Sequence, residues 1–242
     1  MKIIVLSTTP YKEKDTILSA ISENGVVSFK VRGGQTSNGP FTWLHNPLTI
    51  ADVEFVDNPR YTNKIVKGAK LIYSPLNNGQ DLSNLLAIKL LEETTNKMFS
   101  DEDKHLMFSD IESFFTANKG NKDLYLSELI FLIRASRIAG AGLEFNKCVK
   151  CGSKRDIVAF SFEEGGFVCR ECLDESVIID LNAKQMKVLR YCANNSYQNL
   201  IEDKVNENIS ELDKKTILEK FGSFIDNIVG VHLNSLSEIL KN

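Results

Sequence analysis

Residues 148–172 read CVKCGSKRDIVAFSFEEGGFVCREC, and this stretch determines one part of the fold. It contains two Cys-x2-Cys pairs, Cys148 with Cys151 and Cys169 with Cys172, separated by seventeen residues. Each pair places two thiolates on one tight turn, so four sulfurs can surround a tetrahedral metal ion. We therefore predict a zinc ribbon that holds one structural Zn²⁺ through these four cysteines.

The residues between and around the pairs support the ribbon. Residues 157–162 and 165–168 have the pattern of two short strands, and Gly152 stands where a cysteine turn often needs a left-handed residue. Reduced cysteines or disulfides are the alternative, but this spacing is specific and disulfides are rare in the cytosol. The remaining cysteine, Cys192, is predicted to be a core thiol. The ribbon spans about residues 146–175.

An enzymatic site is not predicted. Four thiolates would close the coordination shell, whereas a catalytic zinc needs an open position. The three histidines, His45, His105 and His232, are far apart and lack ligand spacing. The sequence also lacks a phosphate loop, a nucleophile elbow and a recognisable pair of catalytic acids. A zinc hydrolase is therefore a weak alternative.

N-terminal to the ribbon, residues 1–78 predict a small closed β-barrel. Asn24-Gly25 predicts a hairpin, because both residues tolerate the positive φ of a two-residue turn. In residues 49–56, Ile50 is predicted to face inward, and the alternation of inward and outward side chains then shifts by one residue. Such a shift is typical of a β-bulge. The predicted strands are residues 3–7, 16–21, 26–32, 49–56 and 64–73.

Residues 79–242 predict a helical domain around the ribbon, so the chain as a whole is α+β. Apolar residues recur at helical spacing, Gly140 and Gly142 end one helix, and Asn182 and Ser210 each begin another. The stretch 194–208 is interpreted as a loop or weak helix. The predicted stripes are Leu82, Leu85, Leu86, Lys89 and Leu90; Met107, Ile111, Phe114 and Phe115; Leu126, Leu129, Ile130, Ile133 and Arg137; Met186, Leu189 and Cys192; and Leu218, Phe221, Ile225 and Ile228.

Composition and charge exclude several classes of protein. The chain has 242 residues, 43% of them apolar and 25% charged, with a net charge of −3. These values exclude a disordered chain, a uniformly basic nucleic-acid coat and an acidic tail. Residues 1–80 carry a net +3 and residues 81–242 a net −6. Only four apolar residues follow Met1 and Lys2, so we expect a soluble, cytoplasmic protein without a membrane segment.

The basic residues of the N-terminal half suggest a nucleic-acid surface. A cationic groove with aromatic side chains suits single strands, because each stacked base contributes about 1–3 kcal/mol. A solvated strand face with Trp43 in the core is the alternative interpretation. The candidate residues are Lys30, Arg32, Lys64, Lys67, Lys70, Tyr11 and Trp43, with Phe41 as a further possible stacking platform.

The order of these parts resembles the RecO family of bacterial recombination mediators over almost the whole chain. The N-terminal Tyr11-x-Glu13-x-Asp15-x-Ile17-Leu18, followed by Gly25, resembles that family's first hairpin. The central segment of the family is matched by Arg134-x-x-Arg137-x-x-Gly140, Cys148-x2-Cys151 and Gly165-Gly166-Phe167-x-Cys169-x2-Cys172.

The resemblance implies an oligonucleotide-binding (OB) barrel and a non-enzymatic role in DNA repair and recombination. The implied activities are binding single-stranded DNA, annealing complementary strands, and joining RecR so that RecA can displace the single-stranded-DNA-binding protein. It implies cytoplasmic localisation, with association with the nucleoid when DNA is bound. The family's basic loop corresponds here to residues 33–39, which lack lysine and arginine. This departure weakens the expectation of DNA binding through that loop.

The resemblance also implies that the helical domain receives the acidic, hydrophobic C-terminal tail of the single-stranded-DNA-binding protein. Arg134 and Arg137, beside an apolar helix face, are the candidates for pairing with its carboxylates. Alternatively, both arginines cap the solvent edge of a core helix. For the whole protein, the alternative function is a zinc-ribbon adapter that contacts proteins and binds little or no DNA.

Overall fold

The computed structural model describes residues 1–36, 39–56, 64–78, 81–121 and 123–241. Together they form a mixed α+β fold, as predicted. The chain separates into two compact units, Met1–Phe115 and Thr116–Asn242. The domain boundary predicted from composition, between residues 78 and 79, stays a prediction.

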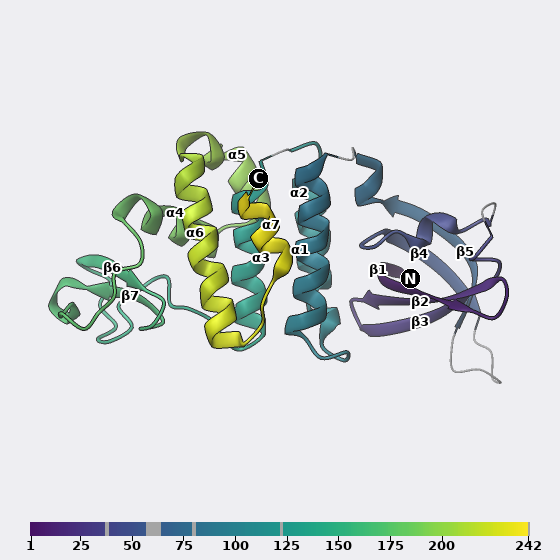
Figure 1. Cartoon of the computed structure of the whole chain (residues 1–242), viewed down its shortest axis with the longest axis horizontal. Coiled ribbons are helices and arrows are strands. Elements are labelled where there is room, and N and C mark those ends of the chain that lie inside the picture. The colour runs from purple at the N-terminus through teal and green to yellow at the C-terminus, as the bar shows by residue number, and fades with distance from the viewer. Residues whose placement is uncertain (37–38, 57–63, 79–80, 122, 242) are drawn as a thin grey trace. The chain divides into compact units, whose positions relative to one another are not determined.

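The first unit contains a closed barrel with the strand order β1-β2-β3-β5-β4 (Figure 1). The pairing of β3 with β5 is parallel and the other pairings are antiparallel. This confirms the predicted barrel and its number of strands. The strands are β1 (Lys2–Tyr11), β2 (Asp15–Ser22), β3 (Gly25–Val31), β4 (Ile50–Val56) and β5 (Lys64–Tyr73).

The barrel core follows from alternation along the strands. Phe29 and Val31 of β3 are fully buried, and they pack with Leu18 of β2 in one hydrophobic cluster. The predicted bulge in β4 is confirmed, because the register with β5 shifts between Ile50 and Ala51. Both residues are buried, as an extra residue in a strand allows.

The first hairpin forms, but its turn lies one residue earlier than predicted. Ser22 pairs with Gly25, so the two turn residues are Glu23 and Asn24. Gly25 has φ 138° and begins β3. The glycine therefore supplies positive φ at the start of the strand rather than inside the turn, where Asn24 keeps negative φ.

The helices of the first unit are only partly as predicted. Met107, Ile111, Phe114 and Phe115 are buried, which confirms the predicted second stripe. The helical segments are α1 (Leu82–Met98), α2 (Phe108–Ala117), and the 3₁₀ turns η1 (Thr42–His45), η2 (Pro75–Asn78) and η3 (Lys104–Met107).

The predicted stripe of α1 is wrong in its first turn. Leu82 and Leu85 are 55% and 39% exposed, whereas burial begins at Leu86 and continues through residue 91 except at Lys89. Buried residues in the middle of α1 include neighbours in sequence, such as Leu90 and Leu91, so this part is buried on more than one face. A single apolar stripe does not describe such a helix.

The second unit is built around α3, which contacts α4, α5 and α6. Residues 126–133 of α3 are all buried. Gly140, with φ 85°, follows the end of α3, as predicted. The helical segments are α3 (Tyr125–Ile138), α4 (Ala183–Asn194), α5 (Tyr197–Glu202), α6 (Glu211–Phe224), α7 (Asn234–Lys241), the 3₁₀ turns η4 (Arg170–Cys172) and η5 (Val205–Asn208), and a π-helical turn η6 (Ile225–Val229).

The predicted helix starts are confirmed. Asn182 caps α4 and forms a capping box with Gln185, while the Ser210 hydroxyl accepts from the Asp213 N–H at 3.2 Å. Ile228 is 61% exposed and does not belong to the predicted stripe. The reason is that α6 widens into η6, which changes the phase after Ile225. Within the described residues, no helix is long and apolar enough to cross a membrane.

Candidate metal centre and nucleic-acid surface

The ribbon is a two-stranded sheet formed by β6 (Ile157–Ser161) and β7 (Gly166–Cys169). The strands are antiparallel, with Ile157 opposite Cys169 and Ser161 opposite Gly166. The end of β7 therefore delivers Cys169, and η4 carries the chain on to Cys172. This is the strand pair predicted from the residues between the cysteines.

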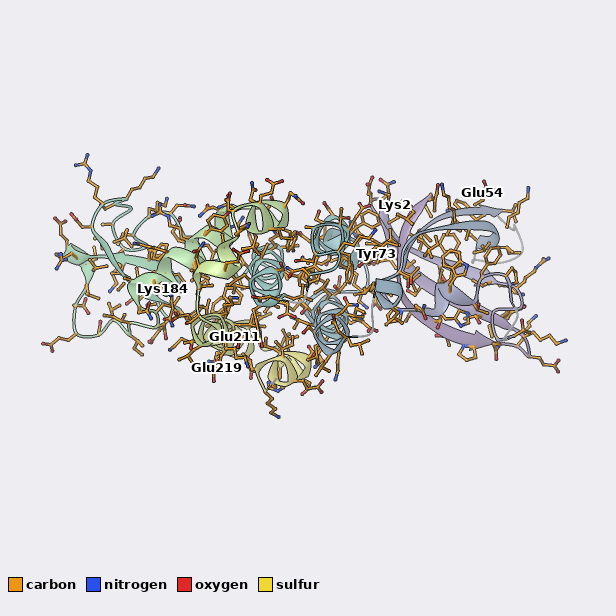
Figure 2. All side chains as sticks on the ribbon, turned by 90° about the horizontal axis from the view of Figure 1, so that it is seen from above. Lys2, Glu54, Tyr73, Lys184, Glu211 and Glu219 are labelled. Carbon is orange, nitrogen blue, oxygen red and sulfur yellow. The ribbon has the colours of Figure 1, made fainter. Side chains whose placement is uncertain are left out.

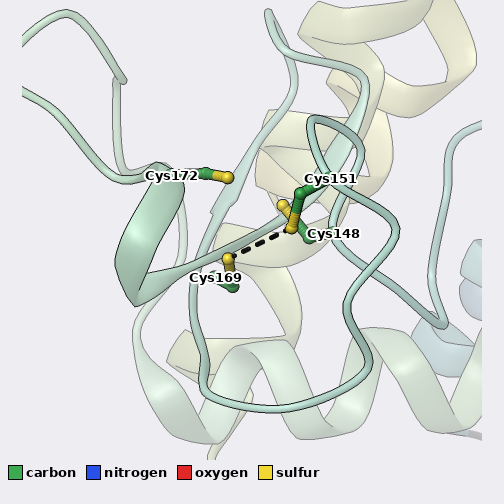
Figure 3. A group of neighbouring side chains, drawn as sticks. All are labelled: Cys148, Cys151, Cys169 and Cys172. Carbon is green, nitrogen blue, oxygen red and sulfur yellow. Dashed lines mark hydrogen bonds between the residues drawn. The ribbon is translucent and has the colours of Figure 1, made fainter.

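The first cysteine pair lies on a compact turn. The Cys148 N–H donates to the Ser153 carbonyl at 2.7 Å, and the Gly152 N–H donates back to the Cys148 carbonyl at 2.9 Å. Gly152 has φ 77°, in the left-handed region, as predicted. The turn directs both sulfurs toward the pair from β7 and η4 (Figure 3).

The four sulfurs have the spacing of a tetrahedral metal site. They all lie within 4.8 Å of one another, and the Sγ atoms of Cys151 and Cys169 are 3.6 Å apart. Four sulfurs at about 2.3 Å from a zinc ion would be about 3.8 Å apart. A disulfide would require about 2.05 Å, and all five cysteines are free. The four cysteines can therefore hold a metal ion.

The acidities of the thiols also fit a cation. Burial raises the pKa of Cys148, but N–H groups of the two cysteine turns outweigh this and lower it to about 6. Hydrogen bonds with the Cys151 and Cys169 sulfurs raise the pKa of Cys172 to about 12. Sulfurs this close share protons, because several adjacent negative charges repel one another. A divalent cation would remove that repulsion and allow all four thiolates to form.

The ribbon is anchored to the helices of its unit by aromatic residues. Phe160 on β6 contacts Phe145, Phe162 and Phe167, and Phe162 contacts both Phe221 and Phe224 at the end of α6. The Asp180 carboxylate accepts from the Phe162 N–H at 2.8 Å and pairs with Lys220 at 3.3 Å. The folding of the ribbon therefore affects the stability of α6.

At the barrel, the structure brings Tyr11 and Lys30 together. The Lys30 ammonium lies 5.3 Å from the centre of the Tyr11 ring and 2.8 Å from an Asp15 carboxylate oxygen. The hydrogen bond from Lys30, helped by the Gly33 N–H, lowers the pKa of Asp15. Arg32 follows the end of β3 and is exposed.

Lys12, which was not among the predicted residues, joins this group. Its ammonium lies 5.4 Å from the Tyr11 ring centre. The sequence signal was available, because lysines flank Glu13 in the turn between β1 and β2. We call Tyr11, Lys12, Lys14, Lys30 and Arg32 the barrel cluster. It has four cationic residues, against the two acidic residues Glu13 and Asp15.

The lysines of β5 lie in more mixed surroundings. Lys64 stacks 4.3 Å from the centre of the Phe55 ring. Lys70 is exposed and stands opposite Asp52 in the register of β4. Lys67 is also exposed and lies at the second bulge, beside Glu54, which Figure 2 shows at the outer edge of the barrel. Each of these two lysines therefore lies near a carboxylate of β4.

Trp43 is positioned by the barrel core. It lies in η1 and packs against the barrel core, as does Phe41. Trp43 is half-buried, and its contact with DNA stays a prediction. Of residues 33–39, which correspond to the family's basic loop, residues 37 and 38 lie outside the described residues. The Gln35 side chain donates a hydrogen bond to the Asp15 carbonyl of the hairpin.

The two arginines of α3 have different surroundings. Arg134 stacks on the Tyr197 ring, 4.8 Å from its centre, and donates to the Asn195 carbonyl at 3.2 Å. Arg137 is exposed in the last turn of the helix. Arg134 thus tethers α3 to the start of α5, whereas Arg137 is accessible to a partner.

Together, fold and site define a class: an OB-like barrel joined in one chain to a helical unit with a four-cysteine ribbon. Two family models match the chain. One, described as Recombination protein O N terminal, matches residues 1–75, and the other, Recombination protein O C terminal, matches residues 79–237. The chain therefore belongs to the RecO family of DNA repair proteins.

Several relatives named DNA repair protein RecO match along most of their length. The protein from Halalkalibacterium halodurans is 25% identical over 236 residues, which cover 96% of this chain and 90% of that protein. The Enterococcus faecalis protein is 26% identical, with coverage of 97% and 88%. The Caldicellulosiruptor bescii protein is 28% identical over 73% of each chain.

Proposed function

We propose that this protein is a non-enzymatic recombination mediator. It binds single-stranded DNA through its barrel, promotes annealing of complementary strands and, with RecR, assists RecA in displacing the single-stranded-DNA-binding protein. It acts in the cytoplasm and associates with the nucleoid when bound to DNA. The observation that carries the DNA-binding step is the barrel cluster, in which two lysines lie over the Tyr11 ring.

The chemistry of the barrel cluster supports contact with a single strand. Cationic side chains neutralise phosphates, and an aromatic ring offers a face for a base. Lys30 is paired with Asp15, so its contribution is reduced. Lys12, Lys14 and Arg32 are exposed and supply most of the available charge. Lys64, Lys67 and Lys70 extend the basic surface along β5, with weaker effect near Asp52 and Glu54.

The four-cysteine site holds one Zn²⁺ and has a structural role. Cys148, Cys151, Cys169 and Cys172 supply a full set of thiolate ligands, which leaves no position for a substrate. When bound, the zinc supplies charge neutralisation and a crosslink between the two cysteine turns. The cysteine turns position β6 and β7, and through Phe160 and Phe162 they support the end of α6.

The helical unit contacts protein partners. We assign the carboxylates of the acidic tail of the single-stranded-DNA-binding protein to Arg137, with Arg134 at the same helix face. Because Arg134 also stacks on Tyr197, its replacement would disturb α5 as well as the partner. Arg137 is the cleaner test of this assignment, since its side chain is exposed.

The test of the main proposal is the salt dependence of single-strand binding. Fluorescence anisotropy of a labelled oligo(dT) with the full chain should show affinity that falls steeply between 50 and 200 mM salt, as roughly expected when several phosphates are contacted. Annealing of two complementary strands and co-purification with RecR should accompany it. A flat salt response, or no binding, would contradict the DNA-binding step.

The alternative function is a protein adapter that does not bind DNA. The absence of lysine and arginine from residues 33–39 favours it. An adapter would co-purify with RecR while failing to shift the anisotropy of oligo(dT). The same two measurements therefore separate the two functions.

A further inference from the structure

A hollow of about 400 Å³ lies beside the ribbon in the second unit. Its walls come from the turn after β6, from the segment that leads to α4, and from the end of α6 with η6. Its volume is within the usual range of binding pockets. Its described lining residues include neither the four cysteines nor the arginines of α3, so it is a separate feature of the helical unit.

The lining of the hollow is mainly apolar. The rings of Phe162 and Phe224 both line it, with their centres 5.6 Å apart. Ile178 and Ile228 also line it, and they are 57% and 61% exposed. A single exposed isoleucine needs no explanation, but four apolar side chains around one hollow form a patch that a partner can cover.

The walls of the hollow are held in place by their neighbours. Phe162 packs against Phe160 and Phe221, and its N–H donates to the Asp180 carboxylate at 2.8 Å. On the other side, α6 continues into the π-helical turn η6, which carries the exposed Ile228. Such turns are often found at functional sites. Because the walls are already ordered, docking requires little further loss of conformational freedom.

The charge around the hollow is negative. Among its charged lining residues, Lys220 pairs with Asp180 at 3.3 Å, and Glu163 is exposed. The segment 163–180, both ends of which line the hollow, contains six acidic residues and one basic residue. Lys150 pairs with two of these carboxylates. With both lysines counted, six acidic residues stand against three basic ones, which favours a positively charged partner.

We propose that this hollow docks a basic, apolar segment of a partner protein. One large apolar side chain of that segment enters between Ile178 and Ile228, and its flanking lysine or arginine side chains meet Glu163 and the neighbouring carboxylates. This surface is opposite in charge to the one assigned to Arg137, which takes carboxylates. The inference does not depend on DNA binding by the barrel, so the two proposals can fail independently.

The test uses the full chain and three labelled synthetic peptides of equal length. The first has leucine and phenylalanine at its centre and two lysines on each side. The second has glutamates in place of the lysines, and the third has alanines in place of the leucine and phenylalanine. Fluorescence anisotropy should show that the first peptide binds at least about tenfold more tightly than either of the others, because they lose the charge complementarity or the buried apolar area.

Two pairs of variants locate the binding. Ile228→Ser should weaken binding of the first peptide at least about fivefold, whereas Ile179→Ser should leave it unchanged. Ile179 follows Ile178 and is 55% exposed, but it is not among the described residues that line the hollow. Glu163→Lys should weaken binding of the first peptide and strengthen binding of the second. Glu211→Lys, at the opposite end of α6, is the matched control for charge.

Thermal melting shows whether each variant remains folded, and the exposed Glu163 tests the site even where Ile228→Ser does not fold. Equal or tighter binding of the glutamate peptide would overturn the basic character of the partner. Equal effects of the two isoleucine variants would overturn the location. No binding of the first peptide at millimolar concentration would overturn the docking site. A dimer in sedimentation velocity that Ile228→Ser abolishes would show instead that a second copy of this chain covers the hollow.

Discussion

Gly165 and Gly166 show how much one residue can depend on its surroundings. Both have positive φ, 85° and 152°. Gly165 is the last residue of the turn that joins β6 to β7, and Gly166 is the first residue of β7. A Cβ at Gly165 would enter open space. A Cβ at Gly166 would instead collide with the backbone of Glu144, which pairs with this residue. The two glycines therefore form a natural matched pair.

We predict that Gly166→Ala destabilises the ribbon far more than Gly165→Ala. The first change forces two backbones apart and costs at least about 3 kcal/mol. The second carries only the cost of positive φ, about 1 kcal/mol. Urea denaturation followed by circular dichroism should show a clearly larger loss for Gly166→Ala. Equal losses would mean that the approach of Glu144 is relaxed at little cost.

Glu128 gives the helical unit a dependence on pH. Burial, and secondarily the charge of Asp123, raises the pKa of Glu128 to about 8. Its folded form is thus protonated at pH 7, whereas the unfolded chain is ionised above about 4.5. Stability is then greatest below pH 4.5 and falls toward pH 8, by at most about 1.4 kcal/mol per pH unit from this group. Asp123 in turn pairs with the buried Lys214.

The corresponding prediction is that Glu128→Gln flattens the fall in stability between pH 5 and pH 8. Unfolding curves in urea at several pH values measure it. Glu219→Gln is the control, because Glu219 is exposed on α6 (Figure 2). A pH profile of Glu128→Gln that matches the unchanged protein would contradict the assignment.

Among the secondary-structure elements, the sequence predicts correctly those features that a short local stretch of residues determines. The phase change at Ile50 predicted a bulge, and the spacing of the cysteines predicted the ribbon, since both depend on the path of one short segment. The exposed start of α1 could not be predicted in this way, because the burial of Leu82 depends on which elements reach it. The turn lies at Glu23 and Asn24, one residue earlier than predicted, because Gly25 adopts its positive φ within β3 and not inside the turn.

The close approach of Gly34 to Thr16 and His45 could not be predicted for the same reason. Thr16, Gly34 and His45 come from three separate segments, and only the closed barrel brings them together. None of the three belongs to a motif. By contrast, the four cysteines that can hold a metal ion form two local pairs, so their grouping could be predicted from the sequence.

For the ribbon as an element, we predict that Cys151→Ser releases the metal. Three thiolates and a hydroxyl bind zinc weakly, so the zinc content should fall from about one ion per chain toward zero. The melting temperature of the helical unit should fall as well, because the ribbon supports α6 through Phe162. Elemental analysis of the purified protein measures the metal, with Cys192→Ala, a buried thiol on α4, as control. Unchanged zinc in Cys151→Ser would show that the ribbon holds no metal through this cysteine.

At the scale of the whole molecule, the net charge of −3 combines two different surfaces. The N-terminal 80 residues carry +3 and the rest −6. A polyanion responds to local charge rather than to the total, because salt screens interactions beyond about 10 Å. Two substitutions that change the net charge equally, at two different places, distinguish local charge from total charge. Arg32, at the barrel cluster, and Arg190, on α4, are both exposed.

We predict that Arg32→Glu weakens binding of oligo(dT), whereas Arg190→Glu does not, although each changes the net charge by the same amount. Losing one phosphate contact should also reduce the slope of log affinity against log salt by about 0.7. Fluorescence anisotropy across a salt series measures both quantities. If the two variants weaken binding equally, the total charge governs association and the barrel cluster is not the contact surface. If neither variant weakens binding, the positive charge of the N-terminal half does not serve DNA binding, and the protein is better described as an adapter.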